Sequence, residues 1–183
     1  QYAKAITFGI MYQAGPAKVA ETANISYPQA KQFIAKYFRE ASNLKIWIEQ
    51  ANTDIERDAY IYSHFGRKRR LPESKSSNNG VAKHAVRSGV NFLVQSVASD
   101  INILGLIDTI NWINTNNYQK VMIPFTVVHD SIVAEVHNDY IKEWVVNVQN
   151  FLQTPRGIEI EECPIGVDFE VGPSWGELNE YKI

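Results

Sequence analysis

Residues 121–136 most constrain the fold, because they place a His-Asp-Ser step between two apolar, β-branched runs. Each run predicts a buried strand, and the polar step predicts the turn of a tight hairpin. A carboxylate in such an apolar setting is costly unless something compensates its charge. A bound divalent cation would provide that compensation and make Asp130 a catalytic ligand. The alternative is an exposed hairpin tip where His129 and Asp130 are ordinary polar residues.

Composition limits the class of protein. The chain has 183 residues, of which 45% are hydrophobic and 21% charged, which suits one globular unit with a core. A net charge of -2 excludes a uniformly basic nucleic-acid binder but allows a local basic patch. The single cysteine, Cys163, excludes an internal disulfide framework and a cysteine-rich zinc site.

No apolar run approaches the roughly 20 residues of a membrane span, and no signal-peptide pattern is present. We therefore expect a soluble, cytoplasmic chain with no membrane partner. Because Gln1 opens directly into a helical pattern without an initiator methionine, we also expect the chain to be part of something longer.

The order of elements predicts an α+β fold, in which helices come first and a small antiparallel sheet with packed helices follows. Ser26 and Pro28 predict the start of a long helix, with an apolar stripe that continues to Ile55. A helix low in charge is expected from about Val81 to Asn114, buried on several sides. The other expected elements are helices over 1–13 and 17–23, a small hairpin formed by 60–62 and the segment after Gly66, a polar loop over 73–80, a helix over about 138–153 and a strand region around 158–171.

One face of the first helix carries Lys4, Phe8 and Tyr12 at a spacing of i, i+4, i+8. Because four residues advance a helix slightly more than one turn, the three side chains share one face. An ammonium followed by two aromatic rings suits a nucleotide, whose phosphates need charge and whose base needs flat apolar surface. The alternative is an amphipathic helix with core aromatics and a lysine that reaches solvent.

Arg87, Asn91 and Gln95 repeat this spacing on the later, mostly apolar helix. Facing a minor groove, they would pair with purine N3 and pyrimidine O2 acceptors, which every base pair presents. The alternative is a solvated polar edge. The run Arg67–Arg70 is either a phosphate-binding patch, whose contacts would be salt-sensitive, or a solvated basic face.

Together these motifs resemble the C-terminal part of a family A DNA polymerase, the DNA polymerase I family that includes many phage replicases. The resemblance covers essentially the whole chain, in order and with matching spacings. It rests on Lys4-x3-Phe8-Gly9-x2-Tyr12, on Ser76-Ser77-Asn78 with Arg87-x3-Asn91-x3-Gln95 and Ala98-Ser99-Asp100-Ile101, on Val128-His129-Asp130-Ser131, and on Glu170-Val171-Gly172-x2-Trp175.

The resemblance implies a function for each residue in template-directed DNA synthesis, with primer-template DNA and dNTPs as partners. Residues 1–66 would be fingers helices, and 67–183 the C-terminal part of the palm. Roles are implied as follows: Lys4 for the triphosphate and the leaving pyrophosphate, Phe8 for the sugar and base, Tyr12 for closing the insertion site, Arg87, Asn91 and Gln95 for the minor groove, His129 for the primer end, and Asp130 for metal binding.

The implied chemistry is in-line attack of the primer 3′-hydroxyl on the α-phosphate, assisted by two Mg²⁺ ions. One aspartate cannot hold two such ions, because each needs several oxygen ligands. The family's second metal-binding aspartate belongs upstream of Gln1. We therefore predict that the isolated chain is inactive and needs an upstream segment or chain.

Two residues depart from the family pattern. Gln13 replaces a glycine after Tyr12, so the end of that helix can differ in shape. Ser131 replaces the glutamate that follows His-Asp in the family motif. In single-subunit RNA polymerases the corresponding motif has the sequence His-Asp-Ser. An RNA polymerase fragment and a non-catalytic DNA-binding or assembly module therefore stay open as alternatives. A hydrolase that uses His129 and Asp130 directly lacks a convincing nucleophile.

Overall fold

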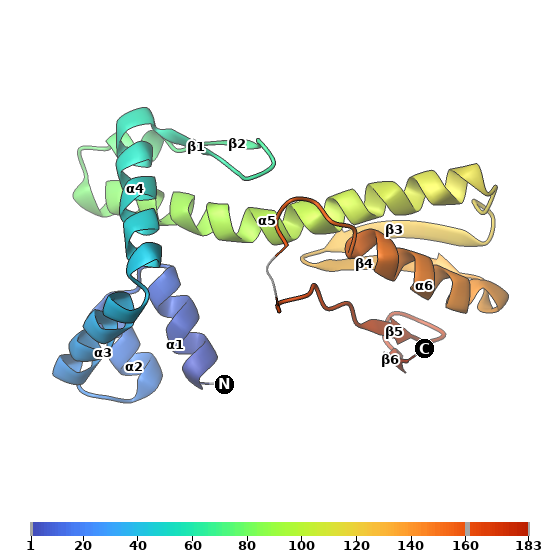
Figure 1. Ribbon diagram of the computed structural model, residues 1–183, viewed down its shortest axis with the longest axis horizontal. Coiled ribbons are helices and arrows are strands. Elements are labelled where there is room, and N and C mark those ends of the chain that lie inside the picture. The colour runs from blue at the N-terminus through green and yellow to red at the C-terminus, as the bar shows by residue number, and fades with distance from the viewer. Residues whose placement is uncertain (1, 160–161, 183) are drawn as a thin grey trace. The chain divides into compact units, whose positions relative to one another are not determined.

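The structure is a computed structural model that describes residues 2–159 and 162–182, with the side chains of residues 2–5 outside that description (Figure 1). The chain divides into two compact units, unit 1 (Gln1–Val97) and unit 2 (Ala98–Ile183), and each is described by itself. Their boundary falls inside the long helix α5 (Asn79–Thr115), whose predicted range is confirmed to within two residues. The predicted division into fingers and palm at residue 66 concerns function and stays a prediction.

Unit 1 begins with four helices, α1 (Tyr2–Met11), α2 (Pro16–Ala23), α3 (Tyr27–Glu40) and α4 (Ser42–Asp58). The predicted start at Ser26 is confirmed by a capping box, since Ser26 N donates to Gln29 Oε1 at 2.9 Å and the Gln29 N–H donates to Ser26 Oγ. The prediction of one long helix from Ser26 is wrong. Ala41 leaves helical geometry with φ -103° and ψ 54°, and this separates α3 from α4.

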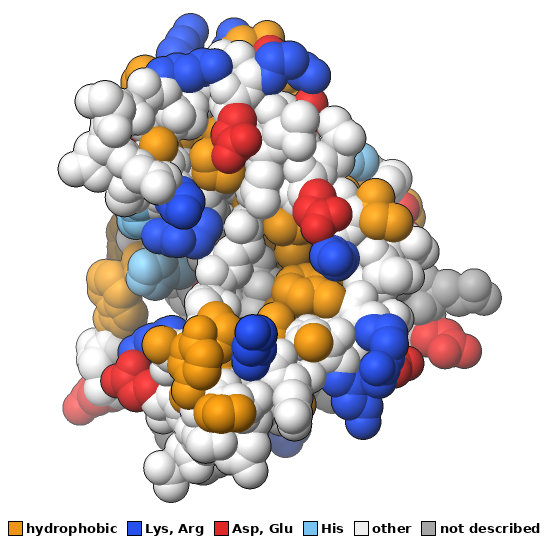
Figure 2. Space-filling view, turned by 90° about the vertical axis from the view of Figure 1, so that its left-hand side faces the viewer, with side chains coloured by type: hydrophobic (Ala, Val, Ile, Leu, Met, Phe, Trp, Pro, Cys, Tyr) orange, Lys and Arg blue, Asp and Glu red, His pale blue; other side chains and the backbone are white. Residues whose placement is uncertain are grey.

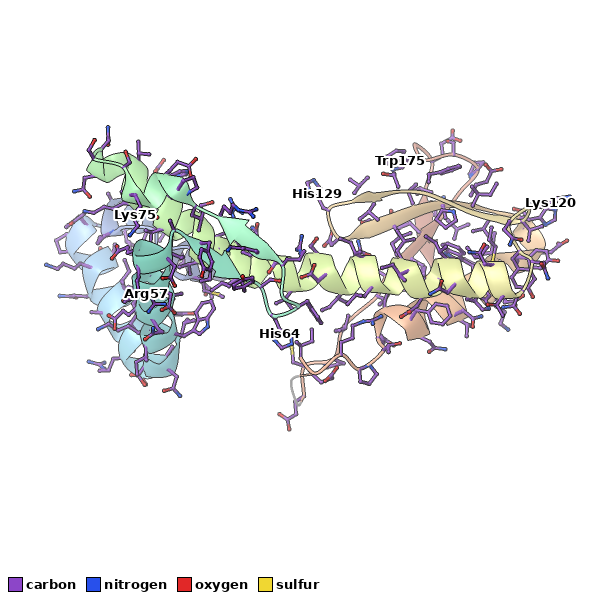
Figure 3. The ribbon with its side chains drawn as sticks, turned by 90° about the horizontal axis from the view of Figure 1, so that it is seen from above. Arg57, His64, Lys75, Lys120, His129 and Trp175 are labelled. Carbon is purple, nitrogen blue, oxygen red and sulfur yellow. The ribbon has the colours of Figure 1, made fainter. Side chains whose placement is uncertain are left out.

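The predicted small hairpin of unit 1 is confirmed as antiparallel strands β1 (Tyr60–Tyr62) and β2 (Lys68–Arg70). The predicted polar loop that follows is instead shortened by a 3₁₀ helix, η1 (Pro72–Lys75), and by the start of α5. Figure 3 labels Lys75 and Arg57 in this region. The Lys75 ammonium donates to the Arg57 carbonyl oxygen at 3.0 Å and so caps the C-terminal turn of α4.

The core of unit 1 joins α4 to the first half of α5. At Gly89 an added Cβ would come within 2.5 Å of Ile55 Cδ1 and 2.6 Å of Leu71 Cδ1, so glycine allows the close approach. A second buried cluster of Ile10, Val19 and Ala30 holds α1, α2 and α3 together. The main cluster consists of Ile48, Ala51, Ile55, Leu71, Val86 and Val90.

Unit 2 contains the predicted hairpin, formed by β3 (Met122–Val128) and β4 (Ser131–Val136). The register shifts between Pro124 and Thr126, which leaves Phe125 as the extra residue of a β-bulge. The other elements are a 3₁₀ helix η2 (Asn138–Tyr140), α6 (Ile141–Leu152), and antiparallel strands β5 (Phe169–Val171) and β6 (Asn179–Tyr181). The buried core consists of Ile113, Met122, Trp144, Val145 and Val148.

Two glycines and one ion pair hold the C-terminal segments of unit 2 in place. Gly105 of α5 lies against Leu152, whose Cδ2 would be 2.5 Å from an added Cβ. The Arg156 guanidinium donates to Asp108 Oδ2 at 2.7 Å and ties the segment after α6 to α5. At Gly172 an added Cβ would meet the Glu177 carbonyl oxygen at 1.8 Å, so the β5–β6 hairpin requires glycine there.

Two predictions about burial are wrong. The run before His129 is buried only at Met122, since Phe125 is 60% exposed and Ile123 is 41% exposed, and the run after it is half-buried rather than buried. The second half of α5 also keeps an exposed apolar stripe of Ile103, Ile107 and Ile110. By length and composition alone α5 could cross a membrane, contrary to expectation, but a core helix of a soluble protein meets the same criterion. Here α5 supplies buried residues to the cores of both units.

Candidate functional site

The nucleotide-face candidates lie on α1 of unit 1. Phe8 is 41% exposed, and its ring stacks on that of Tyr12, with centroids 6.0 Å apart and planes 19° from parallel. Tyr12 lies one residue past the end of α1 and is half-buried. Lys4 belongs to the first half of the helix, but its side chain lies outside the described residues. The two rings therefore form one partly exposed aromatic cluster.

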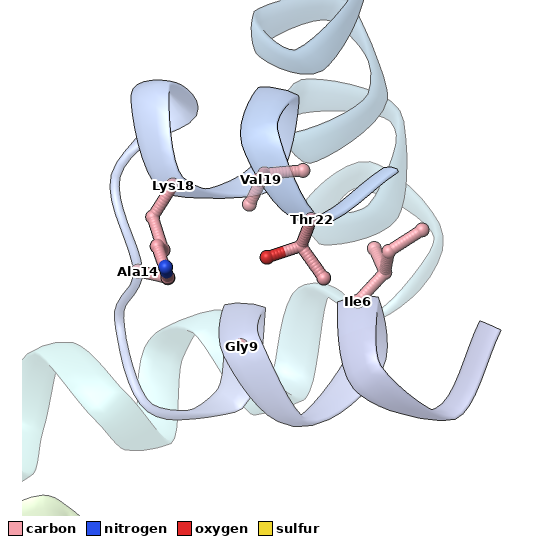
Figure 4. Close-up of a pocket in the computed structure, with 6 residues that line it drawn as sticks. All are labelled: Ile6, Gly9, Ala14, Lys18, Val19 and Thr22. Carbon is pink, nitrogen blue, oxygen red and sulfur yellow. The ribbon is translucent and has the colours of Figure 1, made fainter. Parts of the chain in front are cut away.

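The opposite side of α1 faces α2, and Figure 4 shows the cavity between these helices. Its volume is about 20 Å³, with Ile6, Val19 and Thr22 among the lining residues. That is room for about one water molecule. A nucleotide does not fit in this cavity, so it is not the nucleotide site that the sequence predicts on α1.

The polar stripe on α5 lies opposite the core of unit 1. Val86 and Val90 point into that core, whereas Arg87 and Gln95 are exposed and engage in no side-chain hydrogen bond or ion pair within the described part of the chain. Asn91 is half-buried, and its Oδ1 is a buried atom without a hydrogen-bond partner. The stripe thus offers one guanidinium and two amides for hydrogen bonding.

The basic hairpin, residues Arg67–Arg70, lies against aromatic rings of its own unit. Lys68 Nζ is 3.6 Å from the centroid of the Tyr60 ring, a cation–π distance. The guanidinium of Arg69 lies 5.4 Å from the Phe92 centroid and donates to Ser88 Oγ at 2.8 Å. Sequence reasoning missed Phe92 and Ser88 as partners of the basic hairpin, since cation–π pairing across 23 positions leaves no local pattern.

All four residues of the basic hairpin are exposed. Because Ser88 and Phe92 lie on α5 between and beside the stripe residues, the basic hairpin borders that stripe. Figure 2 shows lysine and arginine interspersed with acidic and apolar side chains on the face that it views. The face in Figure 2 is therefore not uniformly basic, and the basic hairpin is a local cluster of exposed positive charge in unit 1.

His129 and Asp130 form the two-residue turn of the β3–β4 hairpin, as predicted, and Figure 3 shows His129 at its tip. The closing pair of the ladder is Val128 with Ser131. His129 has φ +56°, in the left-handed region that residues other than glycine rarely adopt. Both side chains are exposed, and in the described residues neither one engages in a hydrogen bond or ion pair.

A metal ion would find one carboxylate at this turn, that of Asp130. Among the described residues no group of three His, Cys, Asp or Glu side chains could hold a metal ion. The accessible carboxylate suits one ligand position of a divalent cation, but a complete donor set needs further oxygens. His64, His84 and His137 are exposed.

Comparison with known proteins gives a consistent result. The model of the family described as DNA polymerase family A matches residues 1–177. The chain is 40% identical to the DNA polymerase of Escherichia phage T5, over 92% of this chain and 22% of that polymerase. It is 26% identical to DNA polymerase I of Pseudomonas aeruginosa, over 97% of this chain and 19% of that protein. The chain thus spans about a fifth of the length of these relatives.

A solved structure also matches. It is the POL domain of Pol1 from M. smegmatis, in complex with DNA primer-template and dNTP. The match has a TM-score of 0.74 at 25% sequence identity, and it covers 83% of this chain and 26% of that one.

Proposed function

This chain belongs to DNA polymerase family A, and from that premise we propose that it is the C-terminal fingers and palm part of a DNA-directed DNA polymerase. Its reaction would be nucleotidyl transfer from a dNTP to the 3′-hydroxyl of a primer. The observation that carries the proposal is the exposed Asp130 carboxylate at a two-residue turn. Such a turn presents the carboxylate for metal binding. We place the protein in the cytoplasm of a bacterial or phage-infected cell.

The incoming nucleotide would bind on α1. The stacked rings of Phe8 and Tyr12 offer the apolar surface for the sugar and base, and Tyr12 would close the insertion site. Lys4, one turn before Phe8 in sequence, would pair with the triphosphate and protonate the pyrophosphate leaving group. A phenylalanine at position 8 favours discrimination against dideoxynucleotides, as the resemblance implies.

Primer-template DNA would contact both the α5 stripe and the basic hairpin. Arg87, Asn91 and Gln95 would donate to minor-groove acceptors, which do not depend on sequence. Arg67–Arg70 would hold phosphates beside that groove, since they border the stripe and are exposed. His129 would support the primer end. The expected affinity is sequence-tolerant and salt-dependent.

Asp130 would be one of the carboxylates that hold two Mg²⁺ ions. When bound, these ions supply positive charge to the attacking and leaving oxygens. Asp130 by itself cannot complete such a site. We therefore propose that the second aspartate comes from an upstream segment or chain, and that the isolated chain does not incorporate nucleotides.

The exposed apolar surface of unit 2 supports this dependence on an upstream part. Ile103, Ile107 and Ile110 are 41%, 47% and 41% exposed, at a spacing that puts them on one stripe of α5. On β3, Phe125 is 60% exposed and Ile123 41% exposed. Exposed apolar side chains gathered on one face of an element are typical of a protein–protein contact. The upstream half of the polymerase is the occupant that we assign to this surface.

Primer extension tests the proposal. The isolated chain is expected to show no incorporation, and the chain assembled with the upstream part is expected to extend a primer with dNTPs and Mg²⁺. Robust incorporation by the isolated chain would overturn the upstream requirement. Preference for ribonucleotides in the assembled enzyme would instead identify an RNA polymerase, and template binding without incorporation would identify a non-catalytic module.

A further inference from the structure

The residue that follows Tyr12 is joined to α4 by two reciprocal side-chain hydrogen bonds. Gln13 Nε2 donates to Asn52 Oδ1 at 3.0 Å, and Asn52 Nδ2 donates to Gln13 Oε1 at 3.3 Å. Both residues are half-buried. Each amide therefore uses one donor and one acceptor on the other, and the pairing needs both side chains.

The backbone at Gln13 is in a conformation that favours glycine. Its φ is +59°, in the left-handed region. The Gln13 N–H donates to the Ile10 carbonyl oxygen at 2.9 Å, and the Ala14 N–H donates to that of Gly9 at 2.8 Å, which closes the end of α1. A glycine, as the family motif has here, would make this turn without strain but could not bond to Asn52.

A cavity of about 260 Å³ opens beside the amide pair. Its lining includes Ile10 near the end of α1, Phe38 of α3 and Ile48 of α4. Apolar packing thus leaves a gap between these helices at this point. The amide pair bridges that gap and fixes the last turn of α1 against α4.

From this geometry we infer that Gln13 and Asn52 are positioning residues for the nucleotide face of α1. The inference rests on the proposed function, in which α1 binds the incoming dNTP. Gln13 adjoins Tyr12, and Phe8 stacks on Tyr12, so a turn held at Gln13 orients both rings. The amide pair touches no substrate and acts through Tyr12.

The test measures dNTP affinity of the assembled polymerase on a primer that ends in a dideoxynucleotide, so that no bond forms. Asn52→Leu and Gln13→Gly are each expected to weaken dNTP affinity about three- to tenfold, the effect of losing one hydrogen-bonded pair. Primer-template affinity is expected to stay unchanged, and in steady state KM is expected to rise more than kcat falls. Since both changes remove the same pair, the double variant is expected to match the single ones.

Three further variants separate positioning from folding. The exchange Gln13→Asn with Asn52→Gln keeps the combined side-chain length and is expected to restore affinity. Asn52→Asp keeps the acceptor for Gln13 Nε2 and is expected to cause a smaller loss, which covers the case in which Asn52→Leu fails to fold. Gln50→Leu is the matched control, because Gln50 is an exposed amide of the same helix that bonds to Asp54. It is expected to leave dNTP affinity at the unsubstituted level.

Unchanged or tighter dNTP binding in Asn52→Leu, or losses that add up in the double variant, would overturn the inference. If the unsubstituted assembly binds no dNTP, the proposed function fails instead. The two failures are thereby distinguishable.

Discussion

Two turns carry residues other than glycine in the left-handed conformation beside the candidate functional residues, and the chain holds them differently. Gln13 in unit 1, with φ +59°, is bonded through its side chain to Asn52 of α4. His129 in unit 2, with φ +56°, is exposed, and among the described residues nothing bonds to its side chain. Unit 1 therefore supports its strained turn from within, whereas unit 2 presents its turn outward. Under the proposed function, DNA, metal ions and the upstream part would supply the partners of the His129 turn.

Asp130→Ala gives the largest expected effect. It tests whether the exposed carboxylate of the β3–β4 turn serves catalysis rather than folding. In the assembled polymerase we expect single-turnover incorporation to fall by about two orders of magnitude or more, because a metal ligand is lost. Because Asp130 bonds to no described side chain, the free energy of unfolding is expected to change by less than about 0.5 kcal/mol. Primer-template affinity serves as the control and is expected to equal that of the unsubstituted polymerase. A small change in rate would favour a non-catalytic binding module.

Gly89→Ala tests the internal support of unit 1. The added Cβ would come within 2.6 Å of both Ile55 and Leu71, which are buried, so the core must shift. We expect the free energy of unfolding to fall by about 1–2 kcal/mol. The loss is smaller than overpacking alone would cause, because alanine stabilises a helix relative to glycine. Thermal unfolding measures it. Gly166→Ala is the control, because no atom lies within 4 Å of its added Cβ, and equal losses in both variants would contradict the packing argument.

Lys68→Ala tests whether unit 1 binds phosphates through the basic hairpin. We expect primer-template affinity to fall about two- to fivefold at moderate salt, and the slope of log affinity against log salt to decrease by about one. Titration of fluorescent duplex at several salt concentrations measures both. Lys31→Ala changes an exposed lysine of α3 and is expected to alter neither value. An unchanged salt slope in Lys68→Ala would identify a solvated basic face.

Replacing each strained residue by glycine compares the two turns directly and gives the smallest effect. His129→Gly removes backbone strain and no bond, so we expect the polymerase to gain up to about 1 kcal/mol of stability. Gln13→Gly removes the same strain together with the amide pair, so its net change should be near zero. Denaturant unfolding of both variants measures this difference. Equal gains would show that the amide pair contributes no stability.

Local signals in the sequence were enough to predict several elements. Ser26 with Pro28 predicted the start of α3, and the capping box confirms it. The His129-Asp130 turn was predicted because β-branched runs flank a polar step, and the ladder confirms the hairpin. Each of these depends on residues within a few positions of one another, where capping and turn chemistry operate.

Other features depend on contacts that no local pattern reveals. The apolar stripe from residue 33 to 55 continues through Ala41, so periodicity alone gave no sign of the break between α3 and α4. Burial around Phe125 was overestimated, because an apolar run indicates what a surface can bury and not whether this chain supplies the cover. The Gln13–Asn52 pair joins residues 39 positions apart, and only the fold brings them together. The roles of the individual site residues remain predictions.

The shape of β3 also bears on how the isolated chain would self-associate in concentrated solution. An exposed apolar strand with a free edge is ordinarily a template for fibril growth. Here β3 contains a proline, Pro124, and a bulge at Phe125 that interrupts the ladder. Both features disfavour the regular pairing of a cross-β stack. Self-association of the isolated chain would therefore proceed through apolar faces. We expect such clusters to dissociate on dilution, which would distinguish them from amyloid.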